Sequence, residues 1–304
     1  MTTTTRRREW GAALAFLAAW GLSTAYLAAT GGEWVFPIFS LLVFGIALTG
    51  LGWWLTRHSG APELPVERPR REALALIGYL VVYAVLFVGI LFTTIKTAIP
   101  DPATQEVAMT AFKLLIHVVL PAALLLAIGG KVAPMWDSGI DRPGFWPTLT
   151  LLGLVLVAII VGVTPSIADI RALGLSPGVA AGWAALSFVW MSIEAGLCEE
   201  FLFRAGLQSR LQAWLNSPAV AIAITSLVFA LAHAPGLYLR GGPGTDGWST
   251  DPLQVAAFTI ATIGPISVMF GVIWWRTRSL LLVVLLHGAV DMLPHTAELV
   301  QKFG

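Results

Sequence analysis

The sequence has 304 residues, of which 57% are hydrophobic and only 12% are charged, and its formal net charge is +1. Together with a mean hydropathy of +0.81, this composition excludes an ordinary soluble domain and indicates a membrane protein. The sequence has no basic face interleaved with aromatic residues, which excludes nucleic acid as a partner. The one cysteine, Cys198, excludes an internal disulfide and a multi-cysteine metal site.

Apolar stretches long enough to cross a bilayer recur along the whole chain. A transmembrane helix needs about 20 mostly apolar residues. Nine stretches meet this requirement, at residues 10–29, 34–56, 73–95, 111–130, 148–167, 180–203, 218–235, 253–275 and 279–294. Because backbone polar groups cannot stay unpaired in lipid, stretches of this length predict helices. The expected fold is therefore all-α, a polytopic transmembrane helix bundle of eight to nine spans, integral to the lipid bilayer.

The Lys and Arg residues that flank the predicted spans indicate the orientation of the chain. With nine spans and a cytoplasmic N-terminus, 13 of the 18 Lys and Arg residues fall on the cytoplasmic side, as the positive-inside rule requires. This predicts an N-terminus in the cytoplasm and a C-terminus on the other side, although eight spans would move the C-terminus. The basic start and long apolar run of residues 6–29 also leave a cleaved signal peptide as an alternative.

Ionisable side chains inside the predicted spans are few and cluster toward the C-terminus. Burying a charge in lipid costs at least a few kcal/mol, so such residues usually face a cavity or a partner. In the sixth, seventh and ninth spans they are Glu194, Glu199, Glu200, Arg204, His233, His287 and Asp291. Lys113 and His117, in the fourth span, are expected to lie at a span end or to contact a neighbouring helix. Glu194 is expected to pack or to line the rim of a cavity.

Helical spacing sorts these residues into groups. Glu200 and Arg204 are four residues apart, so they share one helix face and can form an ion pair. Glu199 points about 100° away from Glu200, which leaves its carboxylate free for chemistry. His287 and Asp291 are also four residues apart, so both can project into one site.

Three short motifs on these helices resemble the signatures of a known family. "EEFLFR" (199–204), "FALAH" (229–233) and "HGAVD" (287–291) are similar to the EExxxR, FxxxH and HxxxN/D motifs of the CPBP intramembrane proteases. That family includes the type 2 CAAX prenyl endopeptidases and bacteriocin-processing proteins. The resemblance covers residues 183–293. It implies an integral-membrane peptidase in which Glu199 activates water.

The chemistry of the residues is compatible with such a peptidase. Glu199 is predicted to be the general base, and His233 is predicted to share or orient the proton of the water. His287 and Asp291 are predicted to polarise the scissile carbonyl and to stabilise the oxyanion. Glu200 and Arg204 are predicted to be orienting or structural residues at the site.

Asp291 and the question of a metal leave alternatives open. Many relatives carry Asn where this chain has Asp291, and an ionised aspartate cannot donate a hydrogen bond to an oxyanion. Asp291 must therefore be protonated, orient His287, or help to bind a cation. No cofactor is favoured, but the family is often labelled metalloprotease, and Zn²⁺ held among Glu199, His233, His287 and Asp291 is the alternative. The spacing is not the HExxH of a zinc peptidase helix.

The resemblance also divides the chain and suggests its partners. Residues 1–147 are expected to be accessory transmembrane helices and residues 148–304 the catalytic bundle, within one integral-membrane unit. The expected partner is a peptide or protein substrate at the membrane, with a prenylated CAAX-type substrate as one candidate. Two other function classes stay open. A transporter or proton relay also uses intramembrane Glu, His and Asp, and a catalytically silent scaffold would keep the motifs without activity.

The depth of the polar residues in the bilayer gives a further expectation. At 1.5 Å per residue, His287 lies about 12 Å from the start of its predicted span and His233 about 22 Å from the start of its own. These depths agree only if the seventh span begins later or if the sixth span extends through Arg204. The site is expected in a water-filled cavity that opens to the cytoplasm.

Overall fold

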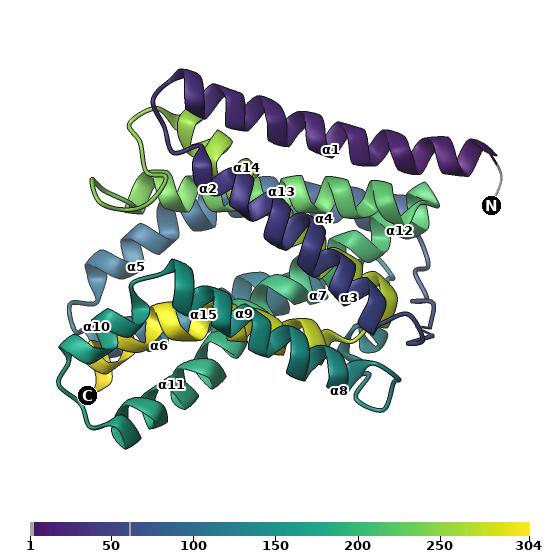
Figure 1. Cartoon of the computed structure of the whole chain (residues 1–304). Coiled ribbons are helices and arrows are strands. Elements are labelled where there is room, and N and C mark those ends of the chain that lie inside the picture. The colour runs from purple at the N-terminus through teal and green to yellow at the C-terminus, as the bar shows by residue number, and fades with distance from the viewer. Residues whose placement is uncertain (1–2, 61) are drawn as a thin grey trace.

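The computed structural model describes residues 3–60 and 62–304, and within them all regular structure is helical. In these residues nine helices are long and apolar enough to cross a membrane. They run back and forth between the two ends of the bundle, so the N-terminus and the C-terminus lie at opposite ends (Figure 1). The predicted all-α, multi-pass bundle is confirmed.

Most spans are built from consecutive helical segments. The first five consist of α1 (Thr3–Ala29); α2 (Val35–Ser40), η1 (Leu41–Leu48) and α3 (Thr49–Leu55); α4 (Pro69–Val82), η2 (Tyr83–Leu91) and α5 (Phe92–Ala98); α6 (Pro102–Leu114), η3 (Leu115–Val119) and α7 (Leu120–Ala127); and α8 (Phe145–Pro147), η5 (Thr148–Leu152) and α9 (Gly153–Val163). The last four consist of α11 (Pro177–Met191), η6 (Ser192–Leu197), η7 (Glu200–Gln208) and α12 (Ser209–Leu215); α13 (Pro218–Arg240); α14 (Pro252–Thr277); and α15 (Leu280–Phe303). Two short helices, η4 (Ala133–Trp136) and α10 (Ser166–Ala172), lie between spans.

Capping residues set the starts of several spans. Asp101 accepts a hydrogen bond from the Thr104 backbone amide at 2.8 Å, and Pro102 occupies the first turn, as expected of a helix N-terminus. Hydrogen bonds from Thr104 hold the pKa of the Asp101 carboxyl below its ordinary value. The fourth span therefore begins at Pro102, well before the predicted residue 111. Ser217 and Ser279 cap α13 and α15 in the same way.

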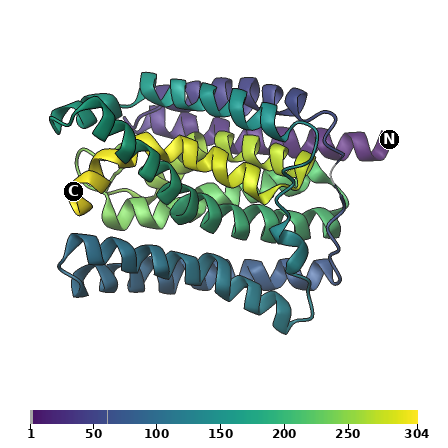
Figure 2. The same ribbon diagram turned by 90° about the horizontal axis from the view of Figure 1, so that it is seen from below.

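The helices form a core that is flanked by a separate layer. In the most apolar 18-residue stretch of each span, the buried share of residues is 72% for α14 and 56% for α15. It is at most 33% for every other span. These two helices are therefore the centre of the bundle. α1 packs on α13 and α14. The two spans of residues 69–98 and 102–127 form a layer of their own on one side (Figure 2).

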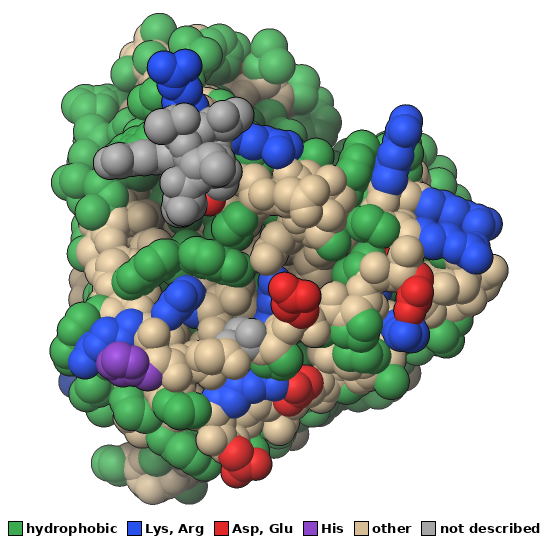
Figure 3. Space-filling view, turned by 90° about the vertical axis from the view of Figure 1, so that its right-hand side faces the viewer, with side chains coloured by type: hydrophobic (Ala, Val, Ile, Leu, Met, Phe, Trp, Pro, Cys, Tyr) green, Lys and Arg blue, Asp and Glu red, His purple; other side chains and the backbone are tan. Residues whose placement is uncertain are grey.

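A buried ion pair fastens this layer to the core at the end of the bundle that carries the N-terminus. Arg210 on α12 donates to Glu72 on α4 at 3.1 Å, and both side chains are at most 1% exposed. Arg210 also donates to the carbonyl of Lys131 at 2.9 Å. Several Lys and Arg side chains gather on the same end of the molecule (Figure 3). This end is the one that the charge distribution predicts to be cytoplasmic, and that orientation stays a prediction.

The sixth span resolves the depth problem that the sequence raised. It runs over Pro177–Leu215, twelve residues beyond the predicted end at residue 203, so Glu199 lies near its middle. The seventh span begins at Pro218 as predicted. The start of α15 is recessed, because Arg278 and Ser279 are buried and Leu280 donates to the carbonyl of Asp137 at 3.1 Å.

Candidate active site

Three helices bring the predicted site residues together in the interior of the bundle. Glu199 lies between η6 and η7, His233 lies on α13, and His287 and Asp291 lie on α15. The Glu199 Oε2 atom is 3.6 Å from His233 Nε2 and 3.7 Å from His287 Nε2. The carboxylate therefore faces two imidazoles that come from two other helices.

Both Glu199 contacts are longer than a direct hydrogen bond. A polar contact longer than about 3.5 Å is one in which a water molecule can take part. The Glu199 side chain is 14% exposed and that of His233 is 34% exposed, whereas that of His287 is 9% exposed. Water thus reaches the carboxylate from the side of His233.

The hydrogen-bond partner of His233 assigns its tautomer. His233 Nδ1 lies 2.8 Å from the carbonyl oxygen of Phe229, which can only accept, so Nδ1 carries a proton. This explains the spacing of the "FALAH" motif, because Phe229 is four residues before His233 on the same helix. The Nε2 atom of His233 is left to face Glu199. The Phe229 ring also contacts His233, with ring centroids 4.7 Å apart.

His287 is held by carboxylates at both ring nitrogens. Its Nδ1 lies 2.9 Å from Glu200 Oε1, and its Nε2 lies 3.3 Å from Asp291 Oδ2. The ring also stacks on Phe270 at a centroid distance of 5.2 Å and an interplanar angle of 19°. His287 is therefore fixed in position and in rotation. Asp291 thus contacts His287, as an orienting role requires, and its role stays a prediction.

Glu200 and Arg204 form the ion pair that their spacing predicts. Both side chains are 0% exposed, and Arg204 Nε lies 3.1 Å from Glu200 Oε2. The N–H is not aligned on the oxygen, so this contact is an ion pair without an aligned hydrogen bond. The guanidinium also lies over the Phe229 ring, 4.7 Å from its centroid. The contact of Glu200 with His287 has no signal in the sequence, because the two residues are 87 positions apart.

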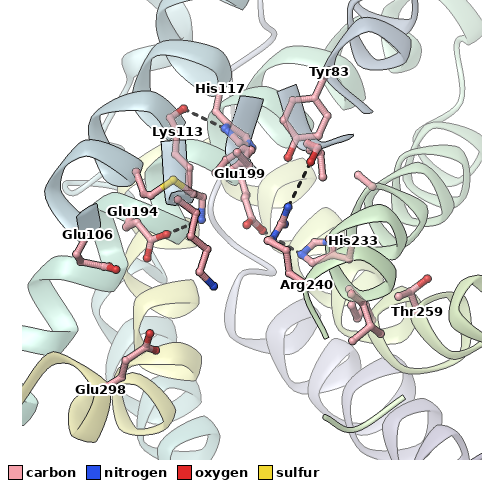
Figure 4. A pocket seen from close by; sticks show the side chains of 18 of the residues that line it. Tyr83, Glu106, Lys113, His117, Glu194, Glu199, His233, Arg240, Thr259 and Glu298 are labelled. Atoms are coloured by element: carbon pink, nitrogen blue, oxygen red, sulfur yellow. Dashed lines mark hydrogen bonds and ion pairs between the residues drawn. The ribbon is translucent and has the colours of Figure 1, made fainter. Parts of the chain in front are cut away.

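A cavity of about 560 Å³ extends from Glu199 toward the ends of several helices. Lys113 and Glu194 line it and form an ion pair at 2.8 Å. His117 also lines it and bonds the Lys113 carbonyl oxygen through Nδ1 at 3.0 Å. Lys113 and His117 do make a helix contact, as predicted, but they also belong to the cavity that contains Glu199 (Figure 4). The expectation that Glu194 lines a cavity is confirmed.

A second cavity, of about 400 Å³, shares several lining residues with the first. Glu199 and His233 line both cavities, and His287 and Asp291 line the second. All four candidates therefore line the second cavity.

The mouth of the larger cavity lies at the end of the bundle opposite the N-terminus. Lys96 near the end of α5, Gln105 near the start of α6, Asp246 between α13 and α14, and Lys302 near the end of α15 line the cavity there. A cytoplasmic N-terminus and a cavity open to the cytoplasm were both expected, and they are incompatible. With the N-terminus in the cytoplasm, the cavity opens on the other side. The sequence indicates a span-end or helix contact for Lys113 and His117, with contact to substrate as the lesser alternative, and it holds no signal for the side on which the cavity opens.

The zinc alternative can be compared with the positions of the candidate ligands. Among residues 3–60 and 62–304, no three His, Cys, Asp or Glu side chains form a group arranged to hold a metal ion. The Nδ1 of His287 is occupied by Glu200, and its Nε2 faces both Asp291 and Glu199. Glu199, His233, His287 and Asp291 as placed therefore do not fit a zinc site.

Comparison with known proteins gives one match. Residues 181–293 match the family model described as Type II CAAX prenyl endopeptidase Rce1-like. No curated protein and no solved structure matched the chain. The matched segment begins in α11 and ends in α15, so it contains all three motifs and every residue proposed for the site. The match confirms the resemblance and the prediction of a membrane peptidase.

Proposed function

From the match of residues 181–293 to the Type II CAAX prenyl endopeptidase Rce1-like family, we propose that this chain is an intramembrane endopeptidase that hydrolyses a peptide bond near the membrane surface. The observation that carries the proposal is the convergence of Glu199 with two imidazoles at one cavity. A carboxylate that has imidazole partners and access to water can carry out general acid–base hydrolysis.

The first step is activation of a water molecule. Water between Glu199 Oε2 and the two Nε2 atoms gives a proton to Glu199, and the resulting hydroxide attacks the scissile carbonyl carbon. His233 Nε2 accepts a hydrogen bond from the second hydrogen of this water and so orients it, because the Nδ1 proton is engaged by the Phe229 carbonyl. The Glu199 proton then passes to the leaving amine nitrogen as the C–N bond breaks.

The second requirement is stabilisation of the oxyanion. His287 in its protonated form donates from Nδ1 to Glu200 and has its Nε2 proton available for the oxyanion. Asp291, 3.3 Å from the same Nε2, holds that proton in place until the substrate carbonyl arrives. Oriented donors of this kind contribute about 2.7–4 kcal/mol to other hydrolases. Glu200 acts as a positioning residue, and Arg204 neutralises its charge.

The substrate is proposed to be a peptide anchored at the membrane, with a prenylated CAAX-type chain as the first candidate. The family description supports this class. The cavity offers apolar walls from Phe92, Phe258 and Leu237 beside the polar centre, a combination suited to a peptide with apolar side chains. No step of the proposed reaction runs through a metal, because the candidate ligands do not form a metal-binding group.

The experiment is a cleavage assay on the purified protein in lipid nanodiscs. A quenched fluorescent peptide ending in a CAAX sequence is offered with and without an isoprenoid group. Wild type should cleave it, whereas His233→Ala and His287→Ala should lose at least about 100-fold in kcat/KM, as expected for loss of an acid–base group. Glu63→Gln, at an exposed loop position, is the control and should cleave normally. If both His variants cleave at the wild-type rate, the proposed mechanism is wrong.

A further inference from the structure

The cations that line the larger cavity differ in whether they have a carboxylate partner. Lys113 pairs with Glu194 at 2.8 Å, and Lys302 lies 2.6 Å from both Glu106 and Glu298. Two cations of the lining have no carboxylate within 4 Å among the described residues, Lys96 and Arg240.

Arg240 is directed into the cavity by the shape of α13. His233, Gly236 and Arg240 stand at positions i, i+3 and i+7, so they share one face of the helix, and all three line the cavity. A Cβ atom added at Gly236 would lie 2.5 Å from Arg240 Nη2. The guanidinium therefore folds back over Gly236 toward His233, into space that only a glycine leaves open. Figure 4 shows Arg240 in the cavity that Glu199 and His233 also line.

The neighbours of the guanidinium hold it in place without neutralising it. Nη1 donates to the carbonyl oxygen of Val88 at 3.3 Å, and the group lies over the Phe92 ring, 5.2 Å from its centroid. Both contacts leave the positive charge and several N–H donors free. A guanidinium in this state binds a carboxylate in a bidentate manner more strongly than it binds water.

The position of Arg240 relative to the reacting centre limits which anion it meets. Along the helix axis, Gly236 lies about 4.5 Å and Arg240 about 10 Å beyond His233, at 1.5 Å per residue. An extended peptide advances about 3.3–3.6 Å per residue. The guanidinium is therefore within reach of a group one to three residues after the scissile bond. The negative charge that every peptide with a free C-terminus carries is its α-carboxylate.

We propose that Arg240 binds the free C-terminal carboxylate of the peptide substrate and so directs cleavage to a bond within about three residues of the C-terminus. This proposal rests on the peptidase function proposed above. Arg240 then selects substrates by their free C-terminus, while Glu199, His233 and His287 perform the chemistry. Lys96, exposed near the mouth of the cavity, adds positive charge on the approach.

The test compares two peptides that differ only at the C-terminus, a carboxylate and a primary amide. For wild type, kcat/KM on the carboxylate should exceed that on the amide by about 10- to 100-fold, mainly through KM, as expected for a charge-assisted pair. Arg240→Gln should abolish this preference, and Arg240→Lys should keep part of it. Gly236→Ala should reduce it without removing the charge. Arg171→Gln, an exposed arginine of α10 outside the cavity, should keep the full preference.

A binding measurement separates this proposal from the peptidase function. Binding of both peptides to Glu199→Gln, and to Glu199→Gln combined with Arg240→Gln, is followed by fluorescence polarisation. Tighter binding of the carboxylate that is lost with Arg240 supports the proposal, even if wild type cleaves neither peptide. Equal binding of the two peptides to Glu199→Gln overturns it. An equal fall in kcat on both peptides in Arg240→Gln also overturns it, because Arg240 would then act on the oxyanion.

Discussion

Removing the charge of Glu200 should expose the energetic role of the ion pair beneath the site. Glu200→Gln leaves the Arg204 guanidinium 0% exposed and without its carboxylate, and its Nη1 and Nη2 atoms have no other hydrogen-bond partner in the described chain. Leaving one partner of a buried pair alone costs about 3–5 kcal/mol. Arg204→Met leaves the Glu200 carboxylate with His287 as its remaining partner and should therefore cost less than Glu200→Gln.

The double variant Glu200→Gln/Arg204→Met should be less destabilised than the sum of the single variants. It buries neither charge, and the glutamine oxygen can still accept the hydrogen bond from His287 Nδ1. For residues in direct contact the coupling is about 0.5–3 kcal/mol, and we expect at least about 1 kcal/mol here, because both charges are fully buried.

The assay is reversible unfolding in mixed micelles with increasing SDS, followed by the fluorescence of the 13 tryptophans. The exposed pair of Glu67 and Lys131 is the matched control, and Glu67→Gln should leave the transition unchanged. Effects that add within about 0.3–0.5 kcal/mol would show that the two residues do not interact and would refute the reasoning.

Three further predictions concern the residues around this pair. In cleavage kinetics, Asp291→Asn should keep activity within about tenfold, because asparagine can still contact His287 and also donates to an oxyanion. Asp291→Ala should lose more activity, and equal losses in the two variants would exclude an orienting role for Asp291. Gly288→Ala should lower both stability and activity, because the added Cβ would overlap Ser192 and push α15 away from η6. An unfolding transition equal to that of wild type would contradict this close packing. Prolonged dialysis against a chelator should leave cleavage unchanged, and loss of activity that zinc restores would mean that Glu199, His233, His287 and Asp291 hold a metal after all.

The spans and the convergence of the motifs could be predicted from the sequence. The hydropathy pattern located all nine helices, and the i, i+4 spacings correctly paired Glu200 with Arg204 and His287 with Asp291. These features depend on local periodicity, which a single sequence records. The division into an accessory part, residues 1–147, and a catalytic part, residues 148–304, stays a prediction.

The end of the sixth span could not be predicted, because its last turns are polar. Gln208 and Arg210 lie beyond the predicted end of the span because their side chains are polar, yet both are buried. Arg210 is accommodated by Glu72, which is 138 positions away. Partners so distant in sequence leave no local pattern, and a helix whose charges are paired with other protein groups is tolerated in the membrane.

The end of the bundle at which the cavity opens could not be predicted from the sequence either. The motifs fix which residues meet, but the direction of the opening depends on how the layer formed by residues 69–98 and 102–127 sits against α13 and α15. Lys113 and Glu194 illustrate this, because their ion pair joins the fourth and sixth spans across the cavity. The contribution of the fourth span to the site became visible only from this contact.

The measurement that tests the account most directly is the rate of peptide cleavage by Glu199→Gln. The substitution keeps the size of the side chain and removes only its ability to take a proton from water. We predict a loss of at least about 100-fold in kcat, as is typical for a missing general base, with an unfolding transition close to that of wild type. Full activity in a folded Glu199→Gln protein would contradict the central claim that this carboxylate activates the water.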